Sequence, residues 1–287
     1  HLELMLDTTN KCNLRCVMCH FAFPSAAAEP LQQWDTAFLA RLERTVLPHV
    51  QHAQLSLGTE PLLWRHFPAL LAACKRARVP VIDMYTNGLL LTRELARCIV
   101  ATPMTRVQFS LEGVSQRGFD QVRVGGKFAD FVARVELLIE MKALLGSDLP
   151  RLQFNLTMLR RNAHEVEDVV RLAGRLGIDY LDIRHVVVHE GLGVDEDSWL
   201  NDKAGYNALM KRVRALATEL GVAIFVQPPD FDLGEGPDAR GVAPVLDSSG
   251  PITTGHVSRG RQSEGPSCHA PWRHFFVRPD RSVVPCT

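Results

Sequence analysis

The sequence lacks several features that would narrow its class of function. No apolar run approaches the length needed to span a bilayer, and no signal peptide precedes the first strand pattern, so no membrane association is expected. Lysine plus arginine and aspartate plus glutamate balance at 32 each, which gives no reason to expect nucleic acid or an acidic membrane as partner. The seven cysteines are odd in number and follow no disulfide framework, which favours a reducing, cytoplasmic compartment.

What is present suits a sizeable globular protein. The 287 residues are 46% hydrophobic and 22% charged, and they are enough for one α/β barrel or for two smaller domains. The chain begins almost inside a strand pattern and stops one residue after Cys286. We therefore expect the natural protein to be longer.

Three cysteines lie close together directly after the first strand pattern. Cys12, Cys16 and Cys19 follow a C-x3-C-x2-C spacing, so three thiolates can reach one metal centre. A cubane iron–sulfur cluster normally takes four thiolates, and a site built from three leaves one iron open to another ligand. Two alternatives remain: buried or disulfide-forming cysteines, of which one would be left unpaired, and a zinc site, which needs a fourth ligand. His20 is adjacent to Cys19 and would be strained in that role.

Short apolar-alternating runs recur between longer helical patterns along the chain. The predicted strands are 2–9, 53–58, 79–87, 106–113, 151–159, 180–188 and 222–227. The predicted helices are 32–47, 62–77, 92–101, 127–145, 163–176 and 203–220, and Gly177 and Gly221 follow the last two as C-terminal caps. This alternation indicates parallel strands joined by right-handed crossovers, which could close into a partial barrel. Cys74 and Cys98 fall inside helical patterns and are interpreted as small core residues.

The predicted strands have one apolar and one polar face. In the fourth strand Val107 and Phe109 alternate with Gln108 and Ser110, whereas strands buried on both faces are apolar throughout. A closed eight-stranded barrel is filled with branched apolar side chains. The polar face therefore predicts an incomplete, wider barrel with a hydrophilic cavity. The alternative is an open sheet with one solvated face.

The cysteine spacing resembles the cluster loop of the radical S-adenosylmethionine (SAM) superfamily. The resemblance implies a partial (β/α)6 TIM-like barrel, and a [4Fe-4S] cluster whose open iron binds the amino and carboxylate groups of SAM. It also implies one-electron cleavage of SAM to methionine and a 5′-deoxyadenosyl radical, with the electron supplied by a flavodoxin- or ferredoxin-like reductant. The superfamily usually has an aromatic residue before the third cysteine. Met18 stands there, which allows an apolar contact with adenine but no stacking.

A second motif lies after the second predicted strand. Gly58, Thr59 and Glu60 precede Pro61, which resembles the Gly-Gly-Glu-Pro motif of the superfamily with threonine in place of the second glycine. The resemblance implies that this turn contacts the SAM ammonium group, with Glu60 as its counter-charge. Taken alone, the motif is also consistent with an ordinary strand-to-helix turn.

The resemblance implies further SAM contacts at the ends of later strands. Asn87 ends the third strand, and Ser110 and Glu112 at the fourth are placed to reach the ribose hydroxyls. Weaker candidates for the methionine carboxylate are found at the fifth strand: Asn155, Thr157 and Arg160. Arg160 with Arg161 is also explained as a solvated strand end. Arg184 and His185 fall where the superfamily approaches adenine, although a lone histidine is more often structural.

The C-terminal part departs from the strand–helix pattern. Residues 228–267 are rich in glycine and proline and read as a linker or lid after a core at 1–227. Residues 268–287 contain a hairpin pattern flanked by Cys268 and Cys286, which resembles the start of the SPASM and twitch extensions. The resemblance implies two ligands of an auxiliary [4Fe-4S] cluster. Arg281 replaces a common glycine, later ligands are not in this sequence, and a disulfide across the hairpin is the alternative.

These patterns together predict a radical SAM enzyme with an auxiliary cluster. The polar barrel lining favours a hydroxylated small molecule such as a sugar, aminocyclitol or nucleoside over a peptide, the main alternative. A non-catalytic iron–sulfur or zinc scaffold would not need the polar lining or the Gly-Thr-Glu-Pro turn. The type of reaction, whether oxidation, epimerisation, crosslinking or elimination, is left open by the sequence, as are the catalytic residues.

Overall fold

A computed structural model of the chain describes residues 2–102, 104–188, 191–233 and 274–284. The strands are β1 (Leu2–Leu6), β2 (Val50–Gln54), β3 (Val81–Thr86), β4 (Arg106–Ser110), β5 (Arg151–Met158), β6 (Tyr180–His185), β7 (Ile224–Gln227), β8 (His274–Val277) and β9 (Val283–Val284). The helices are α1 (Pro24–Ala28), α2 (Thr36–Thr45), α3 (Phe67–Arg76), α4 (Arg93–Ala101), α5 (Gln116–Val122), α6 (Phe128–Leu144), α7 (Val166–Leu176) and α8 (Lys203–Leu220). Short 3-10 turns occur at His20–Ala22, Leu47–His49, Pro61–Leu63, Arg160–Glu165, Asp195–Asp197 and Trp199–Asn201.

One mostly parallel sheet organises the described residues. Its strand order is β7-β6-β5-β4-β3-β2-β1-β8-β9, and only β9 runs antiparallel to its neighbour. The first seven strands therefore stand side by side in chain order, as strand–helix alternation with crossover connections requires. Since β7 and β9 form separate edges, the sheet is an open α/β sheet and not a closed ring, and the predicted fold class is confirmed.

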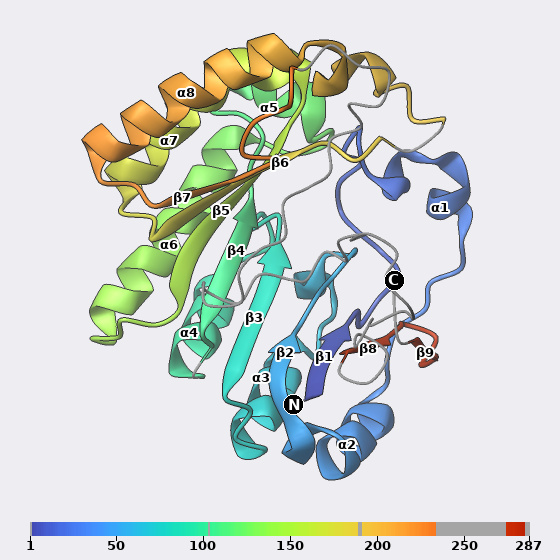
Figure 1. Cartoon of the computed structure of the whole chain (residues 1–287). Helices are drawn as coiled ribbons and strands as arrows, with labels where there is room; N and C mark the ends of the chain where they lie inside the picture. The colour runs from blue at the N-terminus through green and yellow to red at the C-terminus, as the bar shows by residue number, and fades with distance from the viewer. Residues whose placement is uncertain (1, 103, 189–190, 234–273, 285–287) are drawn as a thin grey trace, which may run out of the picture.

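Helices cover the outer face of this sheet (Figure 1). Phe109 of β4 and Phe154 of β5 both pack against Phe131 of α6, with ring centroids 6.1 and 5.9 Å apart. All three side chains are fully buried, and each such burial stabilises the fold by about 1.5–3 kcal/mol. The predicted apolar face is thus the helix-covered face.

The helix ends follow their sequence signals. Asp35 begins α2 by accepting a hydrogen bond from Phe38 N at 2.7 Å, and Thr92 begins α4 in the same way through Leu95 N. Gly177 and Gly221 end α7 and α8 at positive φ of 64° and 67°, as predicted. Cys74 is buried in α3, as expected of a small core residue.

Several elements are shorter than predicted, α1 and α5 were not predicted, and β2 is shifted along the chain. Strand β2 begins at Val50 and not at Ala53, because Val50 and His52 pair with the first residues of β1. It ends at Gln54 because the backbone that follows turns towards the Asp7 carboxylate, which accepts hydrogen bonds from Leu57 N and Gly58 N. Helix α5 was not predicted, because its 7 residues are too few for an apolar period to be recognised.

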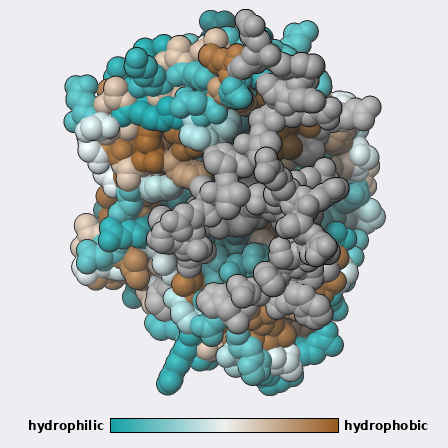
Figure 2. Space-filling view, in the orientation of Figure 1, coloured by the Kyte–Doolittle hydropathy of each residue, from teal (hydrophilic) through white to brown (hydrophobic). Residues whose placement is uncertain are grey.

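The C-terminal hairpin joins the same sheet. Strand β8 pairs in parallel with β1, matching Glu3 with His274, and β9 folds back against β8. The predicted hairpin is confirmed, and it lies beside the first strand of the core. In the described residues, no helix is both long and apolar enough to cross a membrane. Figure 2 shows hydrophilic residues over much of the visible face, with smaller hydrophobic areas between them.

Candidate functional site

The cysteine loop follows β1 at the carboxyl edge of the sheet, where parallel α/β proteins place their sites. Cys19 N donates to Cys16 O at 3.0 Å and Ala22 N donates to Cys19 O at 2.8 Å, which fold the loop into tight turns. All three cysteines are free: Cys16 is buried, and Cys12 and Cys19 are half-buried. A disulfide within the loop is therefore not formed.

Each thiol of the loop lies near a nitrogen from a different residue. The distances are 3.9 Å from Cys12 Sγ to Asn87 Nδ2, 3.8 Å from Cys16 Sγ to Arg123 Nη1, and 3.7 Å from Cys19 Sγ to His20 Nδ1. Asn87 Nδ2 and Arg123 Nη1 are donors, and cluster-bound sulfurs accept hydrogen bonds from such groups in proteins. The surroundings of the three thiols thus fit an iron–sulfur cluster.

Burial raises the pKa of all three thiols, that of Cys16 to about 12. In the metal-free chain they are protonated at neutral pH, so metal binding must displace their protons. Among the described residues, no group of three or more His, Cys, Asp or Glu side chains is arranged to hold a metal ion. A cubane cluster binds each thiolate at a different iron, so its ligands need not converge as those of a single ion do.

The Gly58–Leu62 turn is tied to the cysteine loop. Glu60 N donates to Lys11 O at 3.2 Å, one residue before Cys12. The Glu60 side chain is 1% exposed, and its oxygens accept hydrogen bonds from Leu62 N, Thr86 Oγ1 and Asn87 N at 3.1, 2.8 and 2.8 Å. Burial raises the pKa of Glu60 to about 7, while these hydrogen bonds act in the opposite direction. A carboxyl group in this setting readily ionises beside a cation.

Asp7 was missed by the sequence analysis. It stands one residue after β1, and its buried carboxylate accepts hydrogen bonds from Leu57 N at 2.9 Å, Gly58 N at 3.2 Å and Thr59 Oγ1 at 2.8 Å. Burial raises the pKa of Asp7 in spite of these bonds. This side chain fixes the turn that carries Glu60. Nothing local in the sequence could reveal the contact, because about fifty positions separate its partners.

Asn87 connects β3 to the cysteine loop. Besides approaching Cys12, its Nδ2 donates to Asn13 Oδ1 at 2.8 Å, and its Oδ1 accepts from Leu89 N at 3.0 Å. Asn87, Glu60 and the cysteine loop are therefore brought together.

The end of β4 holds a buried ion pair. Both carboxylate oxygens of Glu112 accept hydrogen bonds from Arg123, through Nε and, at 3.0 Å, through Nη2. Glu112 and Arg123 are 2% and 6% exposed. Glu112 was predicted to lie near a ribose, whereas Arg123 was not predicted, and its only local signal is the Gly125-Gly126 pair two residues later. Ser110, half-buried on the same strand, pairs with Asn155 of β5 in the sheet.

The remaining predicted residues are more spread out. Met18, for which an adenine contact was predicted, packs on a small group of buried apolar side chains that includes Leu159 and Val186. Arg160 is exposed and donates to Glu196 O at 3.3 Å, as a strand-end residue would. His185 accepts from Trp199 N at 3.0 Å, and burial lowers its pKa. Cys268 and Cys286 lie outside the described residues.

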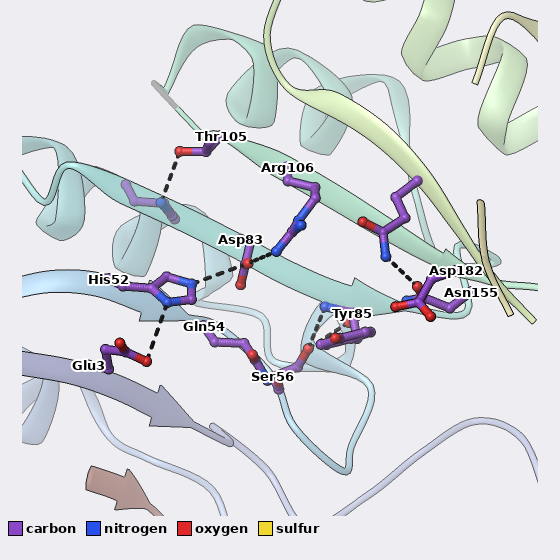
Figure 3. A network of polar contacts seen from close by, with 12 residues as sticks. Glu3, His52, Gln54, Ser56, Asp83, Tyr85, Thr105, Arg106, Asn155 and Asp182 are labelled. Atoms are coloured by element: carbon purple, nitrogen blue, oxygen red, sulfur yellow. Dashed lines mark hydrogen bonds and ion pairs between the residues drawn. The ribbon is translucent and has the colours of Figure 1, made fainter. Parts of the chain in front are cut away.

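The inner face of the sheet carries a polar network (Figure 3). Asp83 of β3 contacts Arg106 at 2.8 Å and His52 at 3.2 Å, and Asp182 of β6 pairs with Arg184 at 2.8 Å. Several buried side-chain atoms on this face have no hydrogen-bond partner among the residues that the structure describes, and they include Gln54 Oε1, Gln108 Nε2, Gln153 Oε1 and Asn155 Nδ2. Such atoms favour a polar ligand against the inner face.

The model of one protein family, the radical SAM superfamily, matches residues 6–173. Among curated proteins, the chain is similar to the probable GTP 3′,8-cyclase of Saccharolobus islandicus, with 25% identity over 67% of the chain. It is also similar to the PqqA peptide cyclase of Methylocella silvestris, with 27% identity over 74% of the chain. The matches span 58% and 55% of these relatives' own lengths.

Among solved structures, SuiB of Streptococcus suis bound to S-adenosylmethionine has a TM-score of 0.69 and 16% identity. That match covers 99% of this chain and 60% of SuiB. A further structure holds SuiB with its precursor peptide SuiA, at a TM-score of 0.70 and 15% identity over 99% of this chain and 59% of SuiB. At this identity the likeness supports the fold alone.

Proposed function

The chain belongs to the radical SAM superfamily, and from that premise we propose that it is an enzyme that abstracts a hydrogen atom from a polar small molecule. Cys12, Cys16 and Cys19 would hold a [4Fe-4S] cluster, with an external flavodoxin- or ferredoxin-like protein as reductant. When bound, this group would supply the chemistry of one-electron SAM cleavage to methionine and a 5′-deoxyadenosyl radical. The observation that carries this proposal is the position of three free thiols beside the buried Glu60 at the carboxyl edge of the sheet.

The chain's own residues have distinct parts in binding SAM. Glu60 would balance the ammonium group, and Asp7 holds the turn from which it projects. Ser110 and Glu112 would face the ribose, since each Glu112 oxygen keeps a second lone pair beside its bond to Arg123. Met18 would provide an apolar contact for adenine, and Asn155 remains the candidate for the methionine carboxylate, ahead of the exposed Arg160.

Anaerobic reconstitution with iron and sulfide tests this proposal. With SAM and dithionite, the reconstituted chain should form 5′-deoxyadenosine, and Cys16→Ala should abolish it. Cys74→Ala is a matched control, because Cys74 is a free thiol buried in α3, and it should keep the activity. A wild-type chain that binds iron but never cleaves SAM would indicate a non-catalytic scaffold.

The inner face of the sheet supports a small, hydrogen-bonding substrate. Its charges are paired, as in Asp83 with Arg106 and Asp182 with Arg184. Several of its amide side chains have atoms without a hydrogen-bond partner in the described part of the chain. A sugar, aminocyclitol or nucleoside offers several hydroxyl groups to such amides. A peptide is the second candidate, since PqqA peptide cyclase and peptide-bound SuiB are among the similar proteins.

Isotope transfer separates these two classes of substrate. Cells that naturally make this protein can be grown in heavy water, and their extract added to the reconstituted enzyme in ordinary water. Deuterium should then appear in 5′-deoxyadenosine, because the radical takes its hydrogen from the substrate. Transfer that survives protease treatment of the extract supports a small molecule, and transfer lost on that treatment supports a peptide.

A further inference from the structure

The guanidinium group of Arg123 stands between a carboxylate and a cysteine of the loop. Its Nε and Nη2 donate to the two oxygens of Glu112, and its Nη1 lies 3.8 Å from Cys16 Sγ. With 6% of Arg123 exposed, solvent screens this charge little. The cation is nearer to the sulfur than its counter-ion is, because the carboxylate binds the opposite edge of the guanidinium.

Backbone hydrogen bonds hold this arrangement on both sides of the two residues. Val17 N donates to Val122 O at 3.0 Å, and Arg15 N donates to Val124 O at 3.1 Å. The neighbours of Cys16 are thus paired with the neighbours of Arg123. Asn162 fixes the other partner, since its Nδ2 donates to Glu112 O at 3.0 Å and to Thr157 O at 2.9 Å.

A buried charge beside a cluster ligand affects how easily the cluster is reduced. Reduction adds one negative charge to the cluster, so a nearby cation favours the reduced form and a nearby anion opposes it. Net charge and hydrogen bonds to the sulfurs are among the main determinants of cluster potentials. Arg123 supplies both at Cys16, and Glu112 offsets part of its charge from the far side.

We propose that Arg123, through its charge and its contact with Cys16, raises the reduction potential of the cluster at Cys12, Cys16 and Cys19. Glu112 moderates this effect. This inference rests on the proposed function, because it requires a cluster at the loop. It assigns the ion pair a part in electron acceptance that is separate from any contact with SAM.

Redox titration of the reconstituted chain, followed by electron paramagnetic resonance without SAM, tests the inference. Glu112→Gln keeps the shape and removes the negative charge, so the midpoint potential should become more positive. Arg123→Met removes the cation and should make the potential more negative, while Arg123→Lys should restore it towards the wild-type value. A purely structural pair would not give shifts of opposite sign.

Asp83→Asn is the matched control. Like Glu112→Gln, it removes a buried carboxylate that is paired with an arginine. Asp83, however, lies four residues before Asn87 on β3, roughly 13 Å along the strand from the residue that contacts the cysteine loop. Its potential should stay near that of the wild type, and a shift equal to that of Glu112→Gln would overturn the inference.

Failure of the inference can be distinguished from failure of the proposed function. A wild-type chain that holds no cluster or forms no 5′-deoxyadenosine would refute the function. If the wild type holds a cluster and forms 5′-deoxyadenosine, but Glu112→Gln has the same midpoint potential as the wild type, only the role of the ion pair is refuted. If Arg123→Met does not fold, the Glu112→Gln and Arg123→Lys potentials decide, and loss of the cluster in Glu112→Gln would also overturn the inference.

Discussion

At the scale of single residues, the site depends on carboxylates that are buried before any cofactor binds. Glu60 and Asp7 are 1% and 4% exposed and satisfy their oxygens with backbone and hydroxyl donors. Burying a carboxylate is costly unless its hydrogen bonds are complete. Glu60 was predictable from its motif, but Asp7 and Arg123 were not, since only the fold brings their partners close.

The raised pKa of Glu60 predicts a pH-dependent stability of the metal-free chain. The folded-state pKa of about 7 lies above the ordinary glutamate pKa of 4.5, so the stabilisation is full below about pH 4.5 and is lost as pH rises through 7. This loss amounts to roughly 3 kcal/mol at most. In Glu60→Gln this part of the pH dependence should disappear, as measured by urea unfolding between pH 5 and 8. An unchanged pH profile would contradict the assigned burial of the charge.

Asp7→Asn is expected to destabilise the chain. Asparagine has one acceptor oxygen in place of two, so its NH2 group would face a backbone N–H that the Asp7 carboxylate accepts from. A buried donor left without an acceptor costs about 1–3 kcal/mol. Glu140→Gln is the control: it removes an exposed carboxylate paired with Arg93 and should change the free energy of unfolding by less than about 1 kcal/mol. Equal effects of the two substitutions in urea unfolding would show that Asp7 does not hold the turn.

At the scale of elements, α5 depends on tertiary contacts more than on its own sequence. Its first turn is capped by Ser115, whose Oγ accepts from Gly118 N at 2.9 Å, and the buried Glu165 carboxylate accepts from Ser115 N at 3.1 Å. Its apolar period is too short to be recognised, whereas α7 and α8 were predicted because their long amphipathic patterns end at glycine. Helix α5 leads into the segment that pairs with the cysteine loop.

Two glycines within helices should respond oppositely to alanine. A Cβ at Gly118 would collide with the Glu165 carboxylate, whereas one at Gly174 in α7 would make ordinary contacts at 3.4 Å or more. Alanine favours a helix over glycine by about 1 kcal/mol. Gly174→Ala should therefore raise the melting temperature and Gly118→Ala should lower it. A rise in both would mean that Glu165 is free to move away from α5.

At the scale of the whole molecule, the sheet was predictable and its C-terminal edge was not. Strand–helix alternation specifies parallel neighbours in chain order, and the structure has them. The pairing of β8 with β1 joins residues about 270 positions apart, and no local pattern encodes it. The auxiliary cluster at Cys268 and Cys286 remains a prediction on residues that the structure does not describe.

Iron analysis tests the auxiliary cluster. In a chain carrying Cys12→Ala, Cys16→Ala and Cys19→Ala together, an auxiliary [4Fe-4S] cluster should leave about four iron atoms per chain after reconstitution. The wild type should then bind about eight. A triple variant without iron, together with about four iron atoms per chain in the wild type, would contradict the prediction of a second cluster.

The central claim is that three thiolates hold a cluster with one corner open to SAM. Its most direct test is the electron paramagnetic resonance spectrum of the reduced, reconstituted chain, recorded with and without SAM. Binding of SAM at an open iron should change the g values of the wild-type signal. Identical spectra in the presence of saturating SAM, or zinc in place of iron in the purified protein, would contradict the claim.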